Sequence, residues 1–257
     1  IIAMYQALSR LGTGGGALLG GLLSDLIGLQ LTFFLFSIMT LSGVILVLEA
    51  GPIRVPGTAP SRDHQMRQTV ERSESFTPFL LWLCVFSLSM TEQMIANLTG
   101  RLVADRIILG IPFSIGIASL TGILLSFRTF GTLFIGPASG VLSDRIGRET
   151  LILAATFLQI IAISSLALFK NWLFGILVLS VQLLASSATR VGIYTLAGDK
   201  APQEGQALFM NRFSTFNDLG TALGPLIAFS IYASFGFGWV AVLAILLLSG
   251  VIGILLK

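Results

Sequence analysis

The chain has 257 residues, of which 54% are hydrophobic and only 11% are charged, and its formal net charge is +3. Soluble domains carry about 25% charged residues, so this composition excludes an ordinary water-soluble domain. Apolar stretches recur that reach the roughly 18 residues needed to cross a bilayer, which predicts an all-α polytopic membrane protein. The basic residues form no stripe with interleaved aromatic residues, so nucleic acid is not an expected partner.

The residue types that usually carry cofactors, metals or covalent chemistry are scarce. His64 is the single histidine, in a polar segment, and Cys84 is the single cysteine, within the apolar run "FLLWLCVFSLSM". We expect Cys84 to be a buried, inert thiol. With no nucleophile–base pair, no HExxH pattern and no cluster of metal ligands, we expect no enzyme activity, no cofactor and no metal.

Hydropathy predicts eight helical spans, at about residues 3–24, 31–49, 78–100, 114–137, 150–169, 173–197, 208–235 and 239–256. Between the second and third spans lies a segment rich in Pro, Arg, Glu and Ser, whose composition is typical of a flexible linker. The other connections are short, so neighbouring helices should run antiparallel.

The positive-inside rule orients these spans if the linker is placed in the cytoplasm. Arg101, Arg106 and Lys170 then lie on the opposite side. The cytoplasmic set is three times larger: Arg54, Arg62, Arg67, Arg72, Arg145, Arg148, Lys200, Arg212 and Lys257. We therefore expect an integral protein of the plasma (inner) membrane with both chain ends in the cytoplasm.

The chain also contains internal similarity. The stretch "LGTGGGALLGGLLSDLIG" (11–28) aligns without a gap with "LGTALGPLIAFSIYASFG" (219–236), so the first two spans resemble the last two. A rival alignment pairs "GGLLSDLIG" (20–28) with "SGVLSDRIG" (139–147), but it loses register after Gly28. We therefore expect Asp25 in an outer turn and Asp144 on the cytoplasmic side.

The segment "GVLSDRIGRE" (140–149) resembles the signature loop of the major facilitator superfamily, G-x-L-(A/S)-D-R-x-G-R-(R/K). Glu149 departs from that pattern, which has a base in its place. The glycines have a physical role, since Gly140 would permit close helix contact and Gly147 a tight turn. The resemblance implies a gating loop in which Asp144, Arg145 and Arg148 bond to neighbouring helix ends in one transport state.

The resemblance implies the fold of that superfamily, with two six-helix bundles. Residues 78–257 would form the complete C-terminal bundle, residues 50–77 a cytoplasmic linker, and residues 1–49 the last two helices of the N-terminal bundle. The first four spans would then be missing, and the N-terminal helices or a partner chain would be needed to complete the cavity. The stretch "GALLGGLL" (16–23) is also similar to an element of antiporters in the family, with Ala17 in place of its proline.

Polar and ionisable side chains within spans are costly in lipid and therefore mark candidate sites. The substrate or proton candidates are Glu92, Gln93, Asn97, Arg128, Gln182, Arg190 and Asp218.

Glu92 and Asp218 are candidate proton carriers. The alternatives are that Glu92 pairs with Arg101 near the outer mouth and that Asp218 pairs with an arginine of a neighbouring span. Arg128 is the candidate for an anionic substrate group, whereas Arg190 and Arg212 are expected near the cytoplasmic ends, in contact with the Asp144 loop.

The resemblance implies a secondary active transporter of a small organic solute or drug-like molecule, working by alternating access in the lipid bilayer. Coupling to protons is an open option. The alternative is a non-transporting, related membrane subunit or assembly factor within a larger complex.

Overall fold

The computed structural model describes residues 2–49, 77–107, 116–168, 171–202 and 205–256. Within these ranges the chain forms eight α-helices and one short π-helical turn, with no β-strand. The predicted linker lies outside the described residues, apart from Thr77, at which α3 begins. The prediction of an all-α fold is confirmed.

Each predicted span corresponds to one helix, and the bounds shift by a few residues in most cases. The helices are α1 (Ile2–Ile27), α2 (Leu29–Glu49), α3 (Thr77–Leu102), continued by the π-helical turn η2 (Val103–Ile107), α4 (Ile117–Ile146), α5 (Arg148–Leu168), α6 (Trp172–Lys200), α7 (Gln206–Phe235) and α8 (Phe237–Leu255).

Six helices among the described residues, α3 to α8, are long and apolar enough to cross a membrane. The apolar parts found in α1 and α2 are shorter, Leu11–Ile27 and Leu29–Ile45.

The end of α4 differs most from the prediction. The expected span stops at Pro137, yet the helix continues through this proline to Ile146. Proline removes one backbone donor, but membrane helices tolerate it because neighbouring groups compensate for the lost hydrogen bond. The segment expected as a loop at 140–146 is therefore the last two turns of α4.

Three pairs of consecutive helices are joined by a single glycine. Gly28, Gly147 and Gly236 separate α1 from α2, α4 from α5 and α7 from α8, with φ values of +87°, +91° and +79°. Glycine adopts positive φ without the steric penalty of a side chain, so one residue suffices to reverse the chain. The structure therefore confirms the tight turn expected at Gly147.

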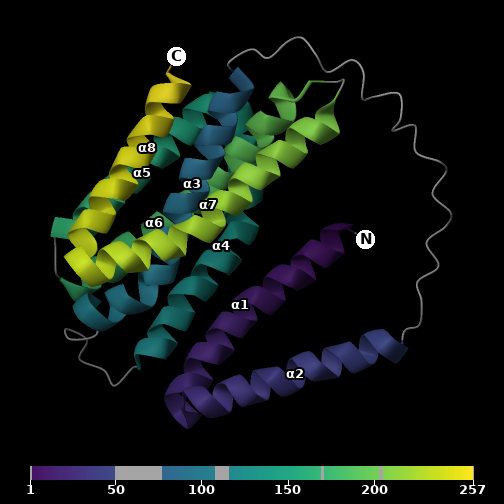
Figure 1. Ribbon diagram of the computed structural model, residues 1–257, viewed down its shortest axis with the longest axis vertical. Helices are drawn as coiled ribbons and strands as arrows, with labels where there is room; N and C mark the ends of the chain where they lie inside the picture. Colours follow the sequence, from purple (N-terminus) through teal and green to yellow (C-terminus); the bar gives the residue numbers. More distant parts are fainter. Residues whose placement is uncertain (1, 50–76, 108–115, 169–170, 203–204, 257) are drawn as a thin grey trace.

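Helices α3 to α8 share one buried core, to which Leu98, Ile163, Leu179 and Leu248 contribute fully buried side chains. The centre of this core is α3, which packs along α7 and also contacts α6 and α8 (Figure 1). Two glycines of α7 allow the close approach, since a Cβ at Gly224 would lie 2.7 Å from the carbonyl oxygen of Met90.

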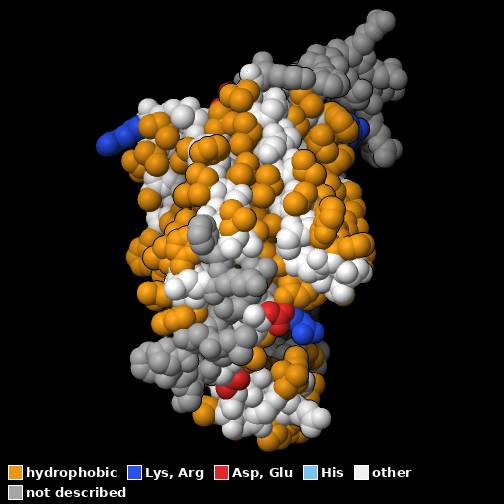
Figure 2. Space-filling model, turned by 90° about the vertical axis from the view of Figure 1, so that its left-hand side faces the viewer, with side chains coloured by type: hydrophobic (Ala, Val, Ile, Leu, Met, Phe, Trp, Pro, Cys, Tyr) orange, Lys and Arg blue, Asp and Glu red, His pale blue; other side chains and the backbone are white. Residues whose placement is uncertain are grey.

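The outer surface is apolar. Figure 2 shows hydrophobic side chains spread over most of the described part of one face, with few charges among them. Large apolar side chains are strongly exposed, for example Phe134 at 77% and Leu168 at 75%. Such an exterior suits lipid as the surrounding solvent, and it supports the assignment as an integral membrane protein.

The first two helices stand apart from the other six in Figure 1, where α1 lies beside α4 and α2 packs on α1. Small residues bring α1 and α4 into backbone contact. A Cβ at Gly122 would lie 2.5 Å from the carbonyl oxygen of Ala17, and a Cβ at Gly21 would touch the carbonyl oxygen of Ala118. Small residues at helix interfaces allow such contact in membranes.

Candidate functional site

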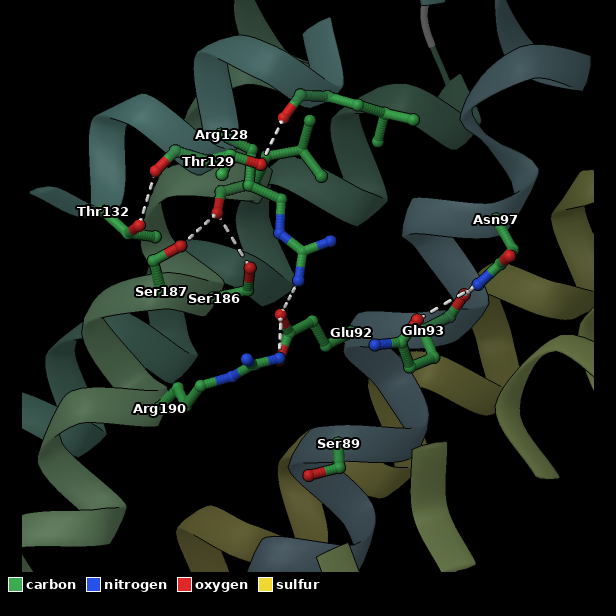
Figure 3. A network of polar contacts seen from close by, with 12 residues as sticks. Ser89, Glu92, Gln93, Asn97, Arg128, Thr129, Thr132, Ser186, Ser187 and Arg190 are labelled. Carbon is green, nitrogen blue, oxygen red and sulfur yellow. Dashed lines mark hydrogen bonds and ion pairs between the residues drawn. The ribbon is translucent and has the colours of Figure 1, made fainter. Parts of the chain in front are cut away.

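Glu92 on α3 forms ion pairs with two arginines from two other helices. Arg128 on α4 contacts Glu92 Oε1, and Arg190 on α6 donates from Nε to Glu92 Oε2 at 3.0 Å. A second guanidinium nitrogen of Arg190 lies 2.5 Å from Oε1. Figure 3 shows the two arginines reaching the carboxylate from different helices. We call Glu92, Arg128 and Arg190 the charge triad.

The charge triad lies within the apolar length of the helices. Glu92 is ten residues before the end of α3 at Leu102, which corresponds to about 15 Å along the helix axis. Its side chain is only 6% exposed and that of Arg128 is 17% exposed. A charge buried among apolar helices is stable only when it is paired. The two ion pairs therefore offset the desolvation cost of burying the Glu92 carboxylate.

A small cavity opens beside the triad. It is lined by Ser89, Glu92, Gln159, Ser186, Thr189, Arg190 and Tyr194, together with the apolar residues Val85, Leu88 and Ile193. The cavity is small, with space for roughly one water molecule. The cavity therefore combines hydroxyl groups, one amide and a partly exposed guanidinium.

Glu92 does not pair with Arg101, contrary to the alternative considered from the sequence. Arg101 is exposed near the end of α3, and the two arginines that contact Glu92 come from α4 and α6. Arg190 was expected near the Asp144 loop, but it contacts Glu92 instead. The expectation failed because long side chains reach across to other helices, which spacing within one helix does not show.

Gln93 and Asn97 lie on another side of α3. The amide of Asn97 donates to Gln93 Oε1 at 3.1 Å and to the Gln93 carbonyl at 2.9 Å. Figure 3 shows this pair directed away from the arginines. Neither residue lines the cavity.

Gln182 is buried between α5 and α6. Its Nε2 lies 3.4 Å from Gln159 Oε1, while Gln159 Nε2 donates to Thr189 Oγ1 at 2.7 Å. Gln159, which lines the cavity, was missed by the sequence analysis. A signal existed, since it is a polar residue in the apolar stretch "LILAATFLQIIAI".

Asp218 on α7 is exposed and forms no ion pair among those of the described residues. Its Oδ1 accepts a hydrogen bond from Asn217 Nδ2 at 3.1 Å, and Asn217 Oδ1 accepts from Ser89 at 2.6 Å. The alternative in which Asp218 pairs with an arginine of a neighbouring span is therefore not observed. Arg212, also on α7, lies over the ring of Trp82 with 5.6 Å to its centroid.

The segment 140–149, which the resemblance suggested as a gating loop, straddles the turn between α4 and α5. Arg148 donates to the carbonyl of Thr195 at 2.9 Å and pairs with Asp199, so it binds the C-terminal end of α6. Glu149 pairs with Lys200 at 2.7 Å in the same place. The family pattern has a basic residue at position 149. In this chain the position is acidic, and the basic partner is Lys200 on α6.

Other charged residues of the same segment are more exposed to solvent. Asp144 is 73% exposed and lies 4.0 Å from Arg148, and Arg145 is exposed. Gly140 was expected to permit close helix contact, but a Cβ there would meet no atom within 4 Å. Among the described residues, no close helix contact is therefore seen at Gly140.

Asp25, which the sequence analysis placed in an outer turn, makes a contact that it did not predict. Its carboxylate accepts from the backbone N–H of Ser119 at 2.6 Å, at the start of α4. Asp144 lies near the other end of the same helix. Asp25 therefore contacts the first turn of α4, and Asp144 lies near the last turn of that helix.

Comparison with known proteins agrees with this architecture. The chain is 28% identical over 242 residues to multidrug resistance protein MdtG of Citrobacter koseri, covering 90% of this chain and 58% of that protein. The same protein of Enterobacter lignolyticus and of Escherichia fergusonii is also 28% identical, with 56% and 57% of those chains covered. The chain thus spans a little over half the length of these relatives. Residues 81–257 match the Major Facilitator Superfamily, and the chain belongs to that family.

Proposed function

We propose that the protein is a secondary active transporter of small organic or drug-like molecules. The observation that carries the proposal is the charge triad, a buried carboxylate held by two arginines where three apolar helices meet. The similarity of the chain to relatives named multidrug resistance proteins supports a drug-like substrate rather than an enzyme reaction. Intramembrane charges of this kind mark substrate and ion pathways.

We further propose alternating access, with movement at the contact between α1 and α4. Residues 78–257 would act as one six-helix bundle and residues 1–49 as two helices of the other bundle, joined by the cytoplasmic linker 50–77. The support is that α3 to α8 share one core, whereas α1 and α2 attach to it through α4. Rocking of one bundle against another is a common mechanism in such transporters.

Proton coupling would use Glu92 or Asp218. Glu92 holds its charge in two ion pairs, so it could take up a proton only after Arg128 or Arg190 moves away. Asp218 is exposed and is held only by the neutral amide of Asn217. Asp218 can therefore be tested for coupling without breaking an ion pair of the described residues.

The motif at residues 140–149 would act as the cytoplasmic gate, and both chain ends would lie on that side. In support, Arg148 and Glu149 bind the end of α6 through exposed ion pairs. Exposed pairs contribute only about 0.2–1 kcal/mol each, so they can separate and re-form during a cycle.

The test is transport by full-length protein reconstituted into liposomes with an imposed pH gradient. We expect gradient-dependent movement of at least one member of a panel containing ethidium, phenylnaphthylamine and anilinonaphthalene sulfonate. Loss of the gradient dependence in Asp218→Asn, with the exposed control Ser37→Ala on α2 unaffected, would support coupling at Asp218. If folded protein moves none of the panel at any pH, a non-transporting membrane subunit becomes the better interpretation.

A further inference from the structure

The charge triad carries an unbalanced positive charge. One carboxylate, Glu92, serves two guanidinium groups, so the three side chains sum to +1. The single acidic residue of α7, Asp218, accepts a hydrogen bond from Asn217, and the described residues show no ion pair between it and either arginine. A buried excess charge is costly, so a site of this kind favours an anion.

The side chains of Arg128 and Arg190 differ in how much of their surface is exposed. The side chain of Arg128 is 17% exposed, whereas that of Arg190 is 47% exposed. Arg190 also lines the cavity, and Arg128 does not. The guanidinium group has five N–H donors, more than its contacts with Glu92 use, so Arg190 has donors to offer on its exposed side.

The groups around Arg190 suit the organic part of an anion. Tyr194 follows one helical turn later on α6, and its ring stands edge-on to Phe213 with 5.1 Å between centroids. Val85, Leu88 and Ile193 supply apolar walls to the same cavity. Because the cavity holds only about one water molecule, an anionic group would meet Arg190 at the mouth of the cavity.

From these observations we infer that Arg190 binds the anionic group of the substrate, so that monoanionic amphiphilic organic molecules are the preferred substrate class. Arg128 then has a different role from the one expected from the sequence, since it holds Glu92 in place. The inference rests on the proposed transport function and adds the sign of the substrate charge. Guanidinium groups recognise carboxylates and related oxyanions through paired, charge-assisted hydrogen bonds.

The experiment measures binding of two probes that differ by one sulfonate group, anilinonaphthalene sulfonate and its neutral parent phenylnaphthylamine. Full-length protein in nanodiscs is titrated with each probe, and energy transfer from tryptophan reports the protein-bound fraction. Trp82 is a suitable donor because it lies one turn before Val85 on α3. Empty nanodiscs provide the lipid background.

Arg190→Gln should weaken sulfonate binding about tenfold, the size of one charge-assisted hydrogen-bonded contact, and leave the neutral probe within about twofold. This variant keeps the neutral pair of Glu92 with Arg128, so the buried carboxylate retains a partner. Arg190→Lys should keep most of the affinity. The matched control is Arg101→Gln, an exposed arginine outside the cavity, which should change neither probe.

Glu92→Gln provides an independent arm. It raises the charge of the triad from +1 to +2, so sulfonate binding should strengthen, whereas a merely structural role for Glu92 would weaken both probes. Unchanged sulfonate affinity in Arg190→Gln overturns the inference. So does equal binding of the two probes by the parent protein, or sulfonate binding that weakens in Glu92→Gln while binding of the neutral probe is unchanged.

Failure of this inference is distinguishable from failure of the proposed function. A protein that transports ethidium or phenylnaphthylamine but ignores the sulfonate is a transporter without anion preference. A protein that binds the sulfonate through Arg190 but moves no probe across the membrane keeps the anion site and loses the transport proposal.

Discussion

The carboxylate of Asp25 on α1 caps the first turn of α4, with 2.6 Å between its Oδ2 and the backbone nitrogen of Ser119. The cap residue of α4 itself, Gly116, has no side chain to bond the free N–H groups. A carboxylate from another helix therefore satisfies one of them and also faces the positive end of the helix dipole. This contact joins the first two helices to the six-helix core.

We expect Asp25→Ala to lower the stability of the protein by about 1 kcal/mol, because it removes a capping hydrogen bond. The measurement is the thermal unfolding midpoint in detergent. Ser37→Ala is the control, since Ser37 is exposed on α2 and its hydroxyl bonds only to the Phe33 carbonyl of its own helix. Equal midpoints for the two variants would show that the cap contributes nothing.

The contact between α1 and α4 should also be sensitive to one added methyl group. A Cβ at Gly122 would lie 2.5 Å from the Ala17 carbonyl oxygen, so Gly122→Ala should push α1 away and cost about 1–3 kcal/mol. Gly136 on the same helix would meet nothing within 4 Å. Gly136→Ala should therefore be neutral or slightly stabilising in the same thermal assay, and similar losses in both variants would refute the packing argument.

The charge triad should behave as a coupled unit in a double-mutant cycle. Glu92→Gln leaves two arginines without their partner and should destabilise by about 3–5 kcal/mol. Adding Arg128→Gln removes one of those unpaired charges, so the double variant should lose less than the sum of the single changes. Asn97→Ala, which affects only the bond to Gln93, is the control. Additive losses would mean that the ion pair does not couple the helices.

The pair of Glu149 and Lys200 should tolerate a charge swap. Glu149→Lys places two lysines together and should cost about 0.5–1 kcal/mol, while the double variant with Lys200→Glu should restore stability. The effect should shrink in high salt, because both side chains are nearly half exposed. Thermal midpoints at low and high ionic strength check this, and a double variant that is worse than either single one would contradict the pairing.

Hydropathy and residue type account for most of the fold. Each of the eight predicted spans became a helix, and Gly147 allows the single-residue turn that its position suggested. The predicted span ended at residue 137, whereas α4 continues through Pro137 to Ile146, as a membrane helix can. Gly28 and Gly236 show the same turn, so turn geometry does not decide between the two internal alignments.

The candidate site was found only in part. Burial cost pointed to Glu92, Arg128 and Arg190 individually, because charged residues are rare within spans. Their pairing was not predicted, since Glu92 is 36 residues from Arg128 and 98 residues from Arg190 along the chain. Asp25 was expected in an outer turn, but its bond to Ser119 was not predicted, because the two residues are 94 positions apart along the chain.

The sequence by itself determined the solvent, the helices and the family pattern, because these depend on hydropathy and on local residue types. Only the tertiary structure decided that two arginines pair with Glu92, that Arg190 is the more exposed of the two, and that Asp25 caps α4. These are contacts between helices distant in the chain, and they depend on how closely the backbones pack. The glycine contacts between α1 and α4 set that distance, and no local pattern encodes which helix will face them.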